Sequence, residues 1–448
     1  TPAPQRCWRR ATASLATAAS PIERGSIEHL FYLAGGGSPL FCGRSPPARD
    51  YALGMQQRIR RARLTTLVAL GAALTLIAAG CSGSGANPSA SASLAASEKP
   101  CIASGDEMAI NSQLLGIGAE AVLCPGAIFA LTAPVIFTNT GQKVYTQGNP
   151  TDDTRATLIV KNDALTVAVR MADVSDAQLT NVIVDGNREE LGYKEGDALV
   201  VAGGAASGQV VSDNVIRNTR SWSSLHIPEW GGPCTTATIE RNIIGPAGTS
   251  KEWADGISLA CTDSIVRDNT IFDATDGAIV VFQARGSIIE GNTIRAETRT
   301  LLGGINMVDY APYSGDYTGT IVRNNTIEAS GAVIRIGLGM GQRIWGCLPA
   351  GDKSQTVRGA TVTGNVLKGT KMQYGFVVSG VEDWTVTDNR DESKHVGTPS
   401  NPCGNTVASK PGGFLIDTRY SKGTFQPEFK GAKLDLALWA IVKPKPGN

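Results

Sequence analysis

The chain carries little charge for its length. Of its 448 residues only 18% are charged, and 41 Lys and Arg nearly balance 40 Asp and Glu to give a net charge of +1. Domains that bind nucleic acids usually show a basic excess gathered on one face. The near-neutral balance therefore argues against a nucleic acid as the partner.

Histidine is scarce, and the cysteines stand far apart. There are three His, and the six cysteines after Cys81 form no Cys-x-x-Cys pair. Zinc sites usually draw on such pairs and on His, so we expect no zinc site. An even number of cysteines in an exported chain indicates disulfides instead. Many connectivities remain open, and chain order and loop position favour Cys101–Cys124, Cys234–Cys261 and Cys347–Cys403.

The sequence lacks an apolar run long enough for an ordinary membrane-spanning helix. The longest, Leu64 to Ala79, has 16 residues, and a spanning helix needs about 20. It follows an Arg-rich segment and ends in AAGC at Cys81, which resembles a bacterial lipoprotein signal. The resemblance implies that Cys81 is lipid-modified and becomes the mature N-terminus. Ordinary secretory cleavage nearby is the alternative.

These features divide the chain into five segments. Residues 1–54 show no sustained period and are interpreted as a non-native extension or a disordered leader. Residues 55–81 form the signal, 82–100 a flexible Ser/Ala linker, 101–425 the folded domain, and 426–448 a C-terminal cap or tail. We expect an exported monomer, either secreted or lipid-anchored to the outer face of the cytoplasmic membrane and touching the membrane only through that anchor.

Glycine, by contrast, is abundant, at 52 residues, and the sequence repeats. Between Ala237 and Arg295 the segments ERNII, RDNTI and EGNTI alternate with ADGISLA and TDGAIVV. Each apolar segment is short, rich in β-branched residues, alternates with period two and is bounded by Gly, Asn or Asp, as strands are. A unit of two strands that recurs in this way predicts a solenoid.

An Asn recurs at the same place in each repeat. The column comprises Asn181, Asn214, Asn242, Asn269, Asn292, Asn325, Asn365 and Asn389. Stacked coils lie about 4.8 Å apart, so the amides of this column can hydrogen-bond from one coil to the next, as stacked Asn does in other cross-strand arrays. Asn also tolerates the left-handed conformation of a tight turn. We assign the column a structural role and no catalytic one.

The start of the folded domain predicts a cap. Ser104 can cap a helix with Met108, Ile110, Leu114 and Leu115 on one face, followed by the first strands. With the coil repeats, this arrangement resembles the pectate-lyase superfamily over residues 101–425. The resemblance implies an all-β fold, a single-stranded right-handed parallel β-helix whose open N-terminal end is plugged by a helix.

Two acids stand out in the repeat. Asp255 and Asp276 each precede a Gly and an apolar strand on consecutive coils. Stacked carboxylates about 5 Å apart repel by roughly 3–4 kcal/mol at an effective dielectric near 20, and such pairs are typical of functional sites. The alternative is that Asp-Gly forms ordinary turns.

The same stretch is similar to polygalacturonases. WADG, TDGA and LGGI stand where that family has NTDG, DDC and GHG on consecutive coils. Ala278 or Gly277 replaces the second Asp of the pair, the family's His is absent, and RIG at Arg335 echoes its RIK. In the related pectate lyases, carboxylates hold Ca²⁺ and an Arg acts as base, for which Arg285 and Arg335 are the candidates. The resemblance makes Ca²⁺ a possible cofactor.

Aromatic residues near the acids favour a sugar-binding groove. The candidate substrate-binding residues are Trp222, Trp230, Trp253, Asp309, Tyr310, Tyr313 and Arg220, with Tyr317 in the same insertion as the tyrosines. Arg220 would bind an acidic sugar, or else be a solvated surface residue. His226 would act as an acid or base, or else be a structural hydrogen-bonding residue.

These residues predict a carbohydrate-active protein that takes a polysaccharide partner. The leading hypothesis is a hydrolase or lyase on a cell-wall or plant-type glycan, with Asp255, Asp276, His226 and Arg285 as catalytic residues. The alternatives are a non-catalytic carbohydrate-binding or adhesion surface, and a structural envelope protein.

Overall fold

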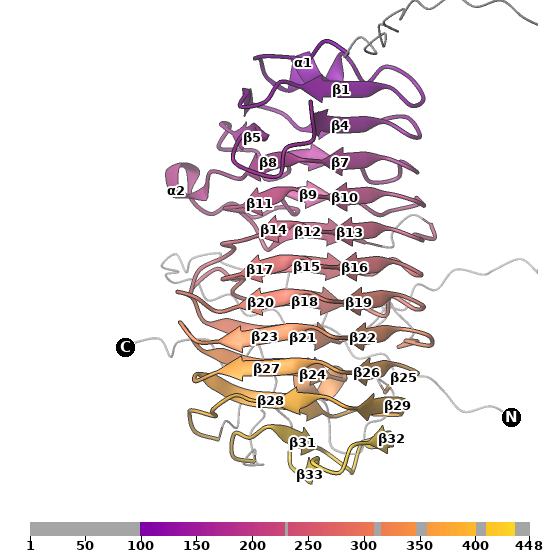
Figure 1. The fold of residues 1–448 in the computed structure, drawn as a ribbon, viewed down its shortest axis with the longest axis vertical. Coiled ribbons are helices and arrows are strands. Elements are labelled where there is room, and N and C mark those ends of the chain that lie inside the picture. The colour runs from indigo at the N-terminus through magenta and orange to yellow at the C-terminus, as the bar shows by residue number, and fades with distance from the viewer. Residues whose placement is uncertain (1–98, 229–231, 309–314, 346–355, 400–408, 435–448) are drawn as a thin grey trace, which may run out of the picture. The chain divides into compact units, whose positions relative to one another are not determined.

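The computed structural model describes residues 99–228, 232–308, 315–345, 356–399 and 409–434. This part of the chain winds through three parallel sheets, which we call A, B and C, and stacks coil upon coil (Figure 1). A representative coil runs through β16 (Ile265–Arg267), β17 (Thr270–Phe272) and β18 (Gly277–Val281), one strand from each sheet. The chain is therefore a single-stranded parallel β-helix, as the repeats predict.

The strands of the three sheets are as follows. Sheet A holds β1 (Glu120–Leu123), β4 (Lys143–Thr146), β7 (Gln178–Thr180), β10 (Val210–Ser212), β13 (Thr238–Glu240), β16, β19 (Ile288–Glu290), β22 (Ile321–Arg323), β26 (Thr361–Thr363) and β29 (Val381–Thr387), with β25 (Val357–Arg358) and β32 (Ser421–Phe425) beside β29. Sheet B holds β2 (Ile128–Leu131), β5 (Ala156–Val160), β8 (Val182–Asp185), β11 (Val215–Arg217), β14 (Ile243–Ile244), β17, β20 (Thr293–Arg295), β23 (Thr326–Ala329), β27 (Val366–Gly369) and β30 (Arg390–Asp391). Sheet C holds β3 (Val135–Ile136), β6 (Val169–Arg170), β9 (Val200–Val201), β12 (Ser223–Ile227), β15 (Asp255–Leu259), β18, β21 (Leu301–Met307), β24 (Ile334–Met340), β28 (Met372–Val378), β31 (Phe414–Ile416) and β33 (Lys430–Gly431).

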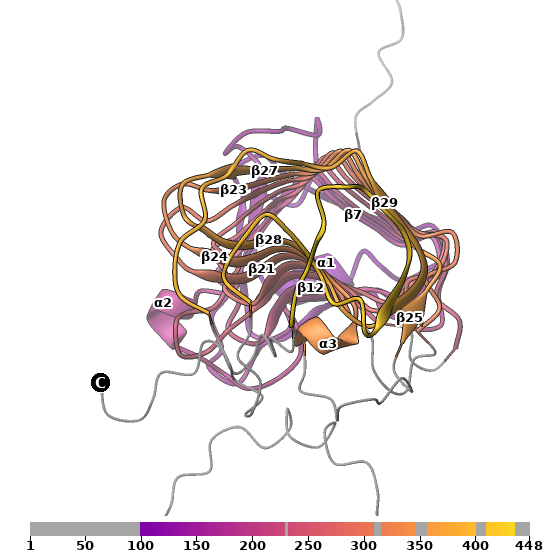
Figure 2. The same cartoon turned by 90° about the horizontal axis from the view of Figure 1, so that it is seen from below.

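The core is the space that the three sheets enclose (Figure 2). Alternate residues of each strand point into it, so that Ile271, Ile294 and Ile327 stack on successive coils and are fully buried. Ile243, which follows Asn242 in β14, is 39% exposed, and its neighbour Ile244 fills the core. Val280 is buried but lies on the opposite side of its strand from the core residues Ile279 and Val281.

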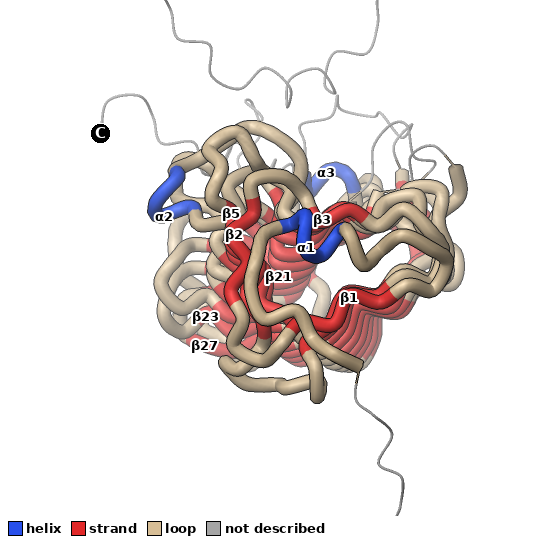
Figure 3. Tube along the Cα trace, turned by 90° about the horizontal axis from the view of Figure 1, so that it is seen from above, coloured by secondary structure: helices blue, strands red, loops and turns tan. Residues whose placement is uncertain are grey.

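A short helix crosses the N-terminal end of the β-helix, as predicted (Figure 3). The helix, α1, spans only Glu107–Asn111, and Asp106 rather than Ser104 caps it, its side chain accepting the backbone N–H of Met108. Ile110 and Leu114 are buried, whereas Met108 and Leu115 are exposed. Two of the four residues predicted for the apolar face are therefore buried and two are not. The helix ends at Asn111, so it is too short to place all four on one face.

The predicted Asn column forms a hydrogen-bonded ladder at the turn between sheets A and B. From Asn214 to Asn389 each amide nitrogen donates to the amide oxygen of the Asn on the next coil, and Gln426 continues the series. Asn181 instead donates to two main-chain carbonyls. We expected the ladder Asn residues themselves to adopt the left-handed conformation. For most of them this is wrong, because the residue before the Asn adopts it instead, for example Asp213, Arg241 and Asp268.

Two disulfides agree with the predicted pairing: Cys101–Cys124 and Cys234–Cys261. They join neighbouring coils and indicate an exported protein. The predicted Cys347–Cys403 bond, the lipidation site Cys81 and the segments up to residue 98 lie outside the described residues. Within the described part of the chain, none of the helices is long and apolar enough to cross a membrane.

Candidate functional site on the outer face of sheet C

The outer face of sheet C carries a group of polar side chains in its middle coils. Ile257, Ile279 and Ile305 point into the core, so their neighbours Ser258, Val280 and Asn306, which share one register position, lie on the outer side. His226 occupies the same row one coil earlier. Strand pairing alone thereby brings polar groups from three coils, those of His226, Ser258 and Asn306, into one line.

Asp255 lies on this face and is 5% exposed. Its carboxylate accepts hydrogen bonds from the Gly277 backbone N–H at 3.0 Å and the Ser258 hydroxyl at 2.8 Å. Ser258 lies 2.9 Å from the Ser223 hydroxyl of the preceding coil. Burial raises the pKa of Asp255 to about 7, although these two hydrogen bonds act in the opposite direction.

Asp276 does not pair with Asp255 in the strand register but lies one residue before the position opposite it. The prediction that the two acids stack in one column is therefore wrong by one residue. Ile257 pairs with Ile279, so Asp255 faces Gly277, while the backbone N–H of Asp276 donates to the Ala254 carbonyl at 3.1 Å. Asp276 is partly exposed, but its Oδ1 is buried without a hydrogen-bond partner. Burial and then the negative charge of Asp255 raise the pKa of Asp276 well above its ordinary value.

The raised pKa values mean that the two carboxyls compete for protons. When one side chain is ionised, its charge makes loss of the proton from the other more costly. A pair of this kind holds one proton over a range of pH, and that proton belongs to the pair rather than to either residue alone. The structure thus brings the two predicted acids into electrostatic contact.

Asn306 is a site residue that the sequence analysis missed. It is fully buried, and neither its Oδ1 nor its Nδ2 has a hydrogen-bond partner. A Cβ added at Gly277 would lie 2.9 Å from Asn306 Nδ2 and 3.5 Å from Asp255 Oδ1, so the glycine leaves room for both polar groups. Gly303 is equally constrained, because a Cβ there would collide with the Asn306 amide. A polar residue inside the apolar run LLGGINM was the available signal.

His226, Trp222 and Asp197 form a second group on the N-terminal side of the acids. The Nδ1 of His226 lies 3.2 Å from Asp197 Oδ1, and the Trp222 ring packs edge-on at a centroid distance of 4.7 Å. Burial raises the pKa of Asp197, but the hydrogen bond and charge of His226 outweigh it, so the net pKa is lowered. Asp197 is therefore ionised, and its carboxylate orients the His226 ring.

Trp253 precedes Asp255 by two residues, and its side chain packs against outer-face residues of later coils. It is partly buried and packs against an apolar cluster of outer-face side chains that includes Leu302, Ile336 and Tyr374. Ile344 of α3 (Gln342–Trp345) belongs to the same cluster, and α3 lies outside sheet C (Figure 2). Trp222 therefore packs on the coil before the acids, and Trp253 packs toward the coils after them.

Arg220 does not bind substrate in this arrangement, contrary to the prediction. It is 1% exposed, and its five N–H groups donate to five main-chain carbonyls in the turns before sheet C. A guanidinium has five N–H donors, so none remains for a ligand. Arg220 instead holds the segments around residues 162–165 and 191–192 together.

Three further predicted positions are not brought to the acids. Arg285 is exposed in the turn at the opposite end of β18 from Asp276, where its charge acts on Asp316. Tyr317 is fully buried and donates its hydroxyl to the carbonyls of Val281 and Val308. Arg335 donates to the Gln373 side chain. The predicted groove residues Trp230, Asp309, Tyr310 and Tyr313 lie outside the described residues.

The residues around the acids do not fit a calcium site. Ca²⁺ takes about six to eight oxygen ligands. Both oxygens of Asp255 already accept hydrogen bonds from protein groups. Among the described residues, no three His, Cys, Asp or Glu side chains gather where they could hold a metal ion. We therefore derive no step through Ca²⁺.

The family comparison agrees with this architecture, which defines a right-handed parallel β-helix protein. Residues 167–391, about half of the chain, match the family model described as right handed beta helix region. The chain belongs to this family, and the fold expected from the resemblance to the pectate-lyase superfamily is confirmed.

The solved structures with a similar fold are distant in sequence. An alginate lyase from Paenibacillus sp. str. FPU-7 is 14% identical with a TM-score of 0.47, covering 66% of this chain and 97% of the lyase. A DFA-IIIase from Arthrobacter chlorophenolicus A6 is 14% identical with a TM-score of 0.46, covering 73% and 92%. PfbA, a surface adhesin of Streptococcus pneumoniae, is 10% identical with a TM-score of 0.41, covering 62% and 80%. No curated protein matches the sequence.

Proposed function

We propose that this protein is an exported enzyme that cleaves a polysaccharide on the outer face of sheet C, with Asp255 and Asp276 as the acid–base pair. The observation that carries the proposal is the pair itself. Burial raises the pKa of both carboxyls on these adjacent coils, and the charge of Asp255 raises that of Asp276 further; perturbed pairs of this kind are concentrated at functional sites. An unpaired amide, that of Asn306, lies beside them.

The causes of the pKa shifts assign the roles. Burial and the negative charge of Asp255 both raise the pKa of Asp276, so Asp276 is the proton donor to the leaving glycosidic oxygen. Asp255 is the carboxylate that takes a proton from the attacking water, since its pKa lies near 7. The glycosidic C–O bond breaks, the water oxygen bonds to the anomeric carbon, and the proton removed from water restores the pair.

The neighbouring side chains suit a sugar chain laid across the coils. Trp222, on the coil before the acids, and Trp253, which packs toward the coils after them, offer partly exposed aromatic surface. His226, oriented by Asp197, would hydrogen-bond a sugar hydroxyl or, in a lyase, take the proton. Asn306 would donate and accept through an amide that has no protein partner. Substrates of the cell-wall or plant-type glycan class meet these requirements.

A non-catalytic carbohydrate-binding surface is the second candidate. The observation that favours it is the engagement of Asp255 with the Gly277 N–H and the Ser258 hydroxyl, which serves folding as well as catalysis. In this case the aromatic residues would bind glycan, and the acids would take no part.

The lipid anchor at Cys81 belongs to the same proposal. The two disulfides support export, and AAGC after an apolar run supports lipidation. Cys81→Ala should release the protein from the membrane fraction or leave it unprocessed. Unchanged processing with unchanged membrane retention would refute the anchor.

Product analysis tests the catalytic proposal. The purified protein is screened against a glycan array and then incubated with the glycans that bind, with and without Ca²⁺, and the products are identified by mass spectrometry and NMR. New reducing ends that disappear in Asp276→Asn support hydrolysis, and unsaturated ends indicate a lyase. Binding without products, retained in Asp276→Asn and weakened in Trp253→Ala, would replace the enzyme with the binding surface.

A further inference from the structure

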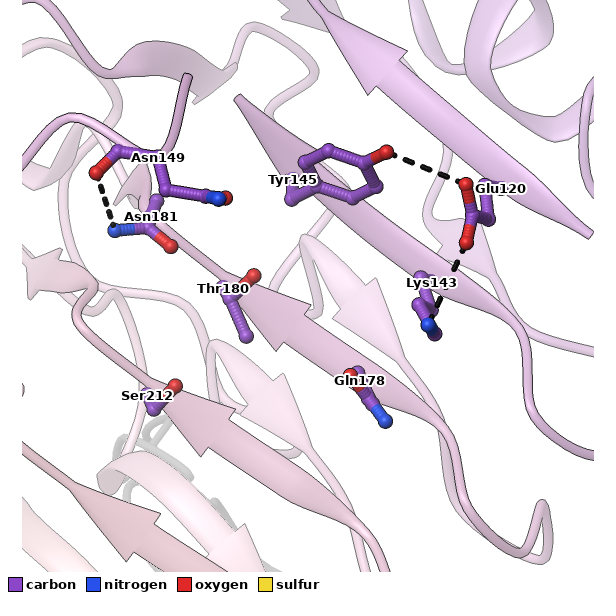
Figure 4. Close-up of a pocket in the computed structure, with 8 residues that line it drawn as sticks. All are labelled: Glu120, Lys143, Tyr145, Asn149, Gln178, Thr180, Asn181 and Ser212. Carbon is purple, nitrogen blue, oxygen red and sulfur yellow. Dashed lines mark hydrogen bonds and ion pairs between the residues drawn. The ribbon is translucent and has the colours of Figure 1, made fainter. Parts of the chain in front are cut away.

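A second surface feature lies away from the acid pair, on the outer face of sheet A. It is a hollow of about 370 Å³ near the N-terminal end of the column (Figure 4). Its lining residues come from β1, β4, β7 and β10 and from the turns beside them: Glu120, Lys143, Tyr145, Asn149, Gln178, Thr180, Asn181 and Ser212. The volume lies at the small end of ligand pockets, roughly 300–1,000 Å³.

Side-chain size along one register row explains the hollow. Tyr145, Thr180, Ser212 and Glu240 stand in register on four successive strands of sheet A. The two small residues in the middle form the floor. Tyr145 stands at one end of the row, and Glu240, which is bound to Arg267 at 2.6 Å, stands next to Ser212 at the other. Because the row repeats about every 4.8 Å, two small residues in succession leave a depression the length of one or two sugar rings.

The lining is polar but has little net charge. Glu120 forms ion pairs with Lys143 at 3.4 Å and Lys99 at 3.6 Å. Burial raises the pKa of Glu120, yet the hydrogen bond and charge of Lys143 outweigh burial and lower it overall, so the carboxylate is ionised at neutral pH. The remaining lining groups are amides and hydroxyls. A charged ligand would find no excess of opposite charge here.

Tyr145 supplies the one aromatic surface of the lining. Its hydroxyl donates to Glu120 at 3.2 Å. Figure 4 shows the ring over β4, between Glu120 on one side and Asn149 and Asn181 on the other. An aromatic ring held by its hydroxyl, surrounded by amides and hydroxyls, matches a sugar's apolar C–H face and its ring of hydroxyls.

We propose that this hollow is a binding site for a neutral saccharide, separate from the acid pair on sheet C. Tyr145 packs against the sugar ring, Gln178 and Asn149 hydrogen-bond its hydroxyls, and Thr180 and Ser212 form the floor. The inference does not depend on the catalytic proposal, since it rests on residues of a different sheet.

Two substitutions test the site, and the second has a matched control. Tyr145→Ala removes the ring. Thr180→Leu fills the floor, and Thr363→Leu makes the same change in the same register row of sheet A outside the hollow. Binding of neutral trisaccharides (cellotriose, mannotriose and triacetylchitotriose) and of a galacturonate trimer is followed by saturation-transfer NMR and calorimetry. Thermal unfolding shows that each variant is folded.

We expect at least one neutral trisaccharide to bind to the wild type and to Asp276→Asn alike. Tyr145→Ala and Thr180→Leu should each weaken this binding about 10-fold or more, and Thr363→Leu should leave it unchanged. Absence of binding, a preference for the galacturonate trimer, or binding that survives both substitutions would overturn the proposal. Binding lost in Trp253→Ala but kept in Tyr145→Ala would place the sugar on sheet C, leaving the catalytic proposal intact.

Discussion

The Asn ladder and the outer face of sheet C use the same amide group under opposite conditions. Asn269 is 1% exposed, and both ends of its amide are bonded: Nδ2 donates to Ile239 and Asn292, and Oδ1 accepts from Asn242. Asn306 is also fully buried, and neither end is bonded. An unpaired buried polar group costs about 1–3 kcal/mol, so Asn306 destabilises the fold where Asn269 stabilises it.

The fold requires the bonded amides of the ladder, whereas it only tolerates the unbonded amide of Asn306. Ladder residues satisfy one another because each coil repeats the one before it. On sheet C the residues in the Asn306 row change from coil to coil, from His226 to Ser258 to Val280 to Asn306. A buried polar group that the fold leaves unpaired calls for an explanation beyond folding, and a ligand that reached it would supply the missing partner. This contrast is the physical basis for placing the site on sheet C.

Activity should show the largest effect. Asp255→Asn and Asp276→Asn should each lower turnover by at least about 100-fold, the scale of a lost general acid or base, while the circular dichroism spectrum stays unchanged. If either variant keeps more than about a third of the wild-type rate on a cleaved glycan, the acid–base assignment fails.

The pH profile should follow from the same pair. The active form holds one proton, so kcat/KM should rise through a pKa of about 7 as the first proton is lost. It should fall again at higher pH as the second is lost. A profile that rises near pH 4 would show that the two carboxyls titrate as ordinary, separate groups.

Stability should distinguish the two amides. Asn269→Ala removes the partners of Asn242 and Ile239 and should cost about 2–4 kcal/mol of unfolding free energy. Asn306→Ala should change stability by less than about 1 kcal/mol, or raise it, because no hydrogen bond is lost. Urea unfolding measures both. Equal losses would mean that Asn306 has structural partners after all.

The acid pair should also leave a mark on stability. A carboxyl whose folded pKa is raised binds its proton more tightly in the folded state, so stability falls as pH rises from about 4 to 7. Asp255→Asn should flatten this decline and raise stability at pH 8 by roughly 1–3 kcal/mol. Thermal unfolding at pH 4.5 and pH 8 of wild type and variant makes the comparison. A variant less stable than wild type at pH 8 would contradict the shift.

A His–Asp pair on a later coil should give the smallest effect. His395 lies 3.0 Å from the Gln373 carbonyl through Nδ1 and 2.8 Å from Asp391 through Nε2. Burial lowers its pKa, but Asp391 outweighs burial and raises it overall. The stability it contributes is therefore full below pH 6.5 and lost as pH rises through the folded pKa. His395→Gln should cost about 1 kcal/mol at pH 5.5 and less at pH 9. An equal loss at both would refute a charged His395.

The sequence predicts the ladder well because its signal is repeated. Every coil from Asn181 to Asn389 supplies an Asn, so no single register has to be known, and the strands that follow are fixed by their apolar residues. The acid column is different. Asp255 follows Asn242 by 13 residues and Asp276 follows Asn269 by 7, so turn length, not sequence position, sets their register, and the prediction is off by one residue.

Two other features could not be read from the sequence. The five carbonyls that surround Arg220 come from turns far apart along the chain, and no local pattern announces them. Asn306 stands in an apolar strand with no recurring partner, so its place beside Asp255 emerges only once Gly277 and Gly303 are in register. Periodic interactions are predictable because they repeat, whereas a site is assembled from exceptions to the repeat.

The most direct test of the account is a titration of the two carboxyls without any substrate. The side-chain carboxyl carbons of aspartate are labelled with ¹³C, and their shifts are followed from pH 3 to pH 10 in the wild type, Asp255→Asn and Asp276→Asn. We expect two coupled titrations in the wild type, the first with a midpoint near 7, and a lower midpoint for Asp276 in Asp255→Asn, where the charge of Asp255 is removed. Two independent midpoints near 4 would contradict the central claim that this face of the β-helix holds a shared proton.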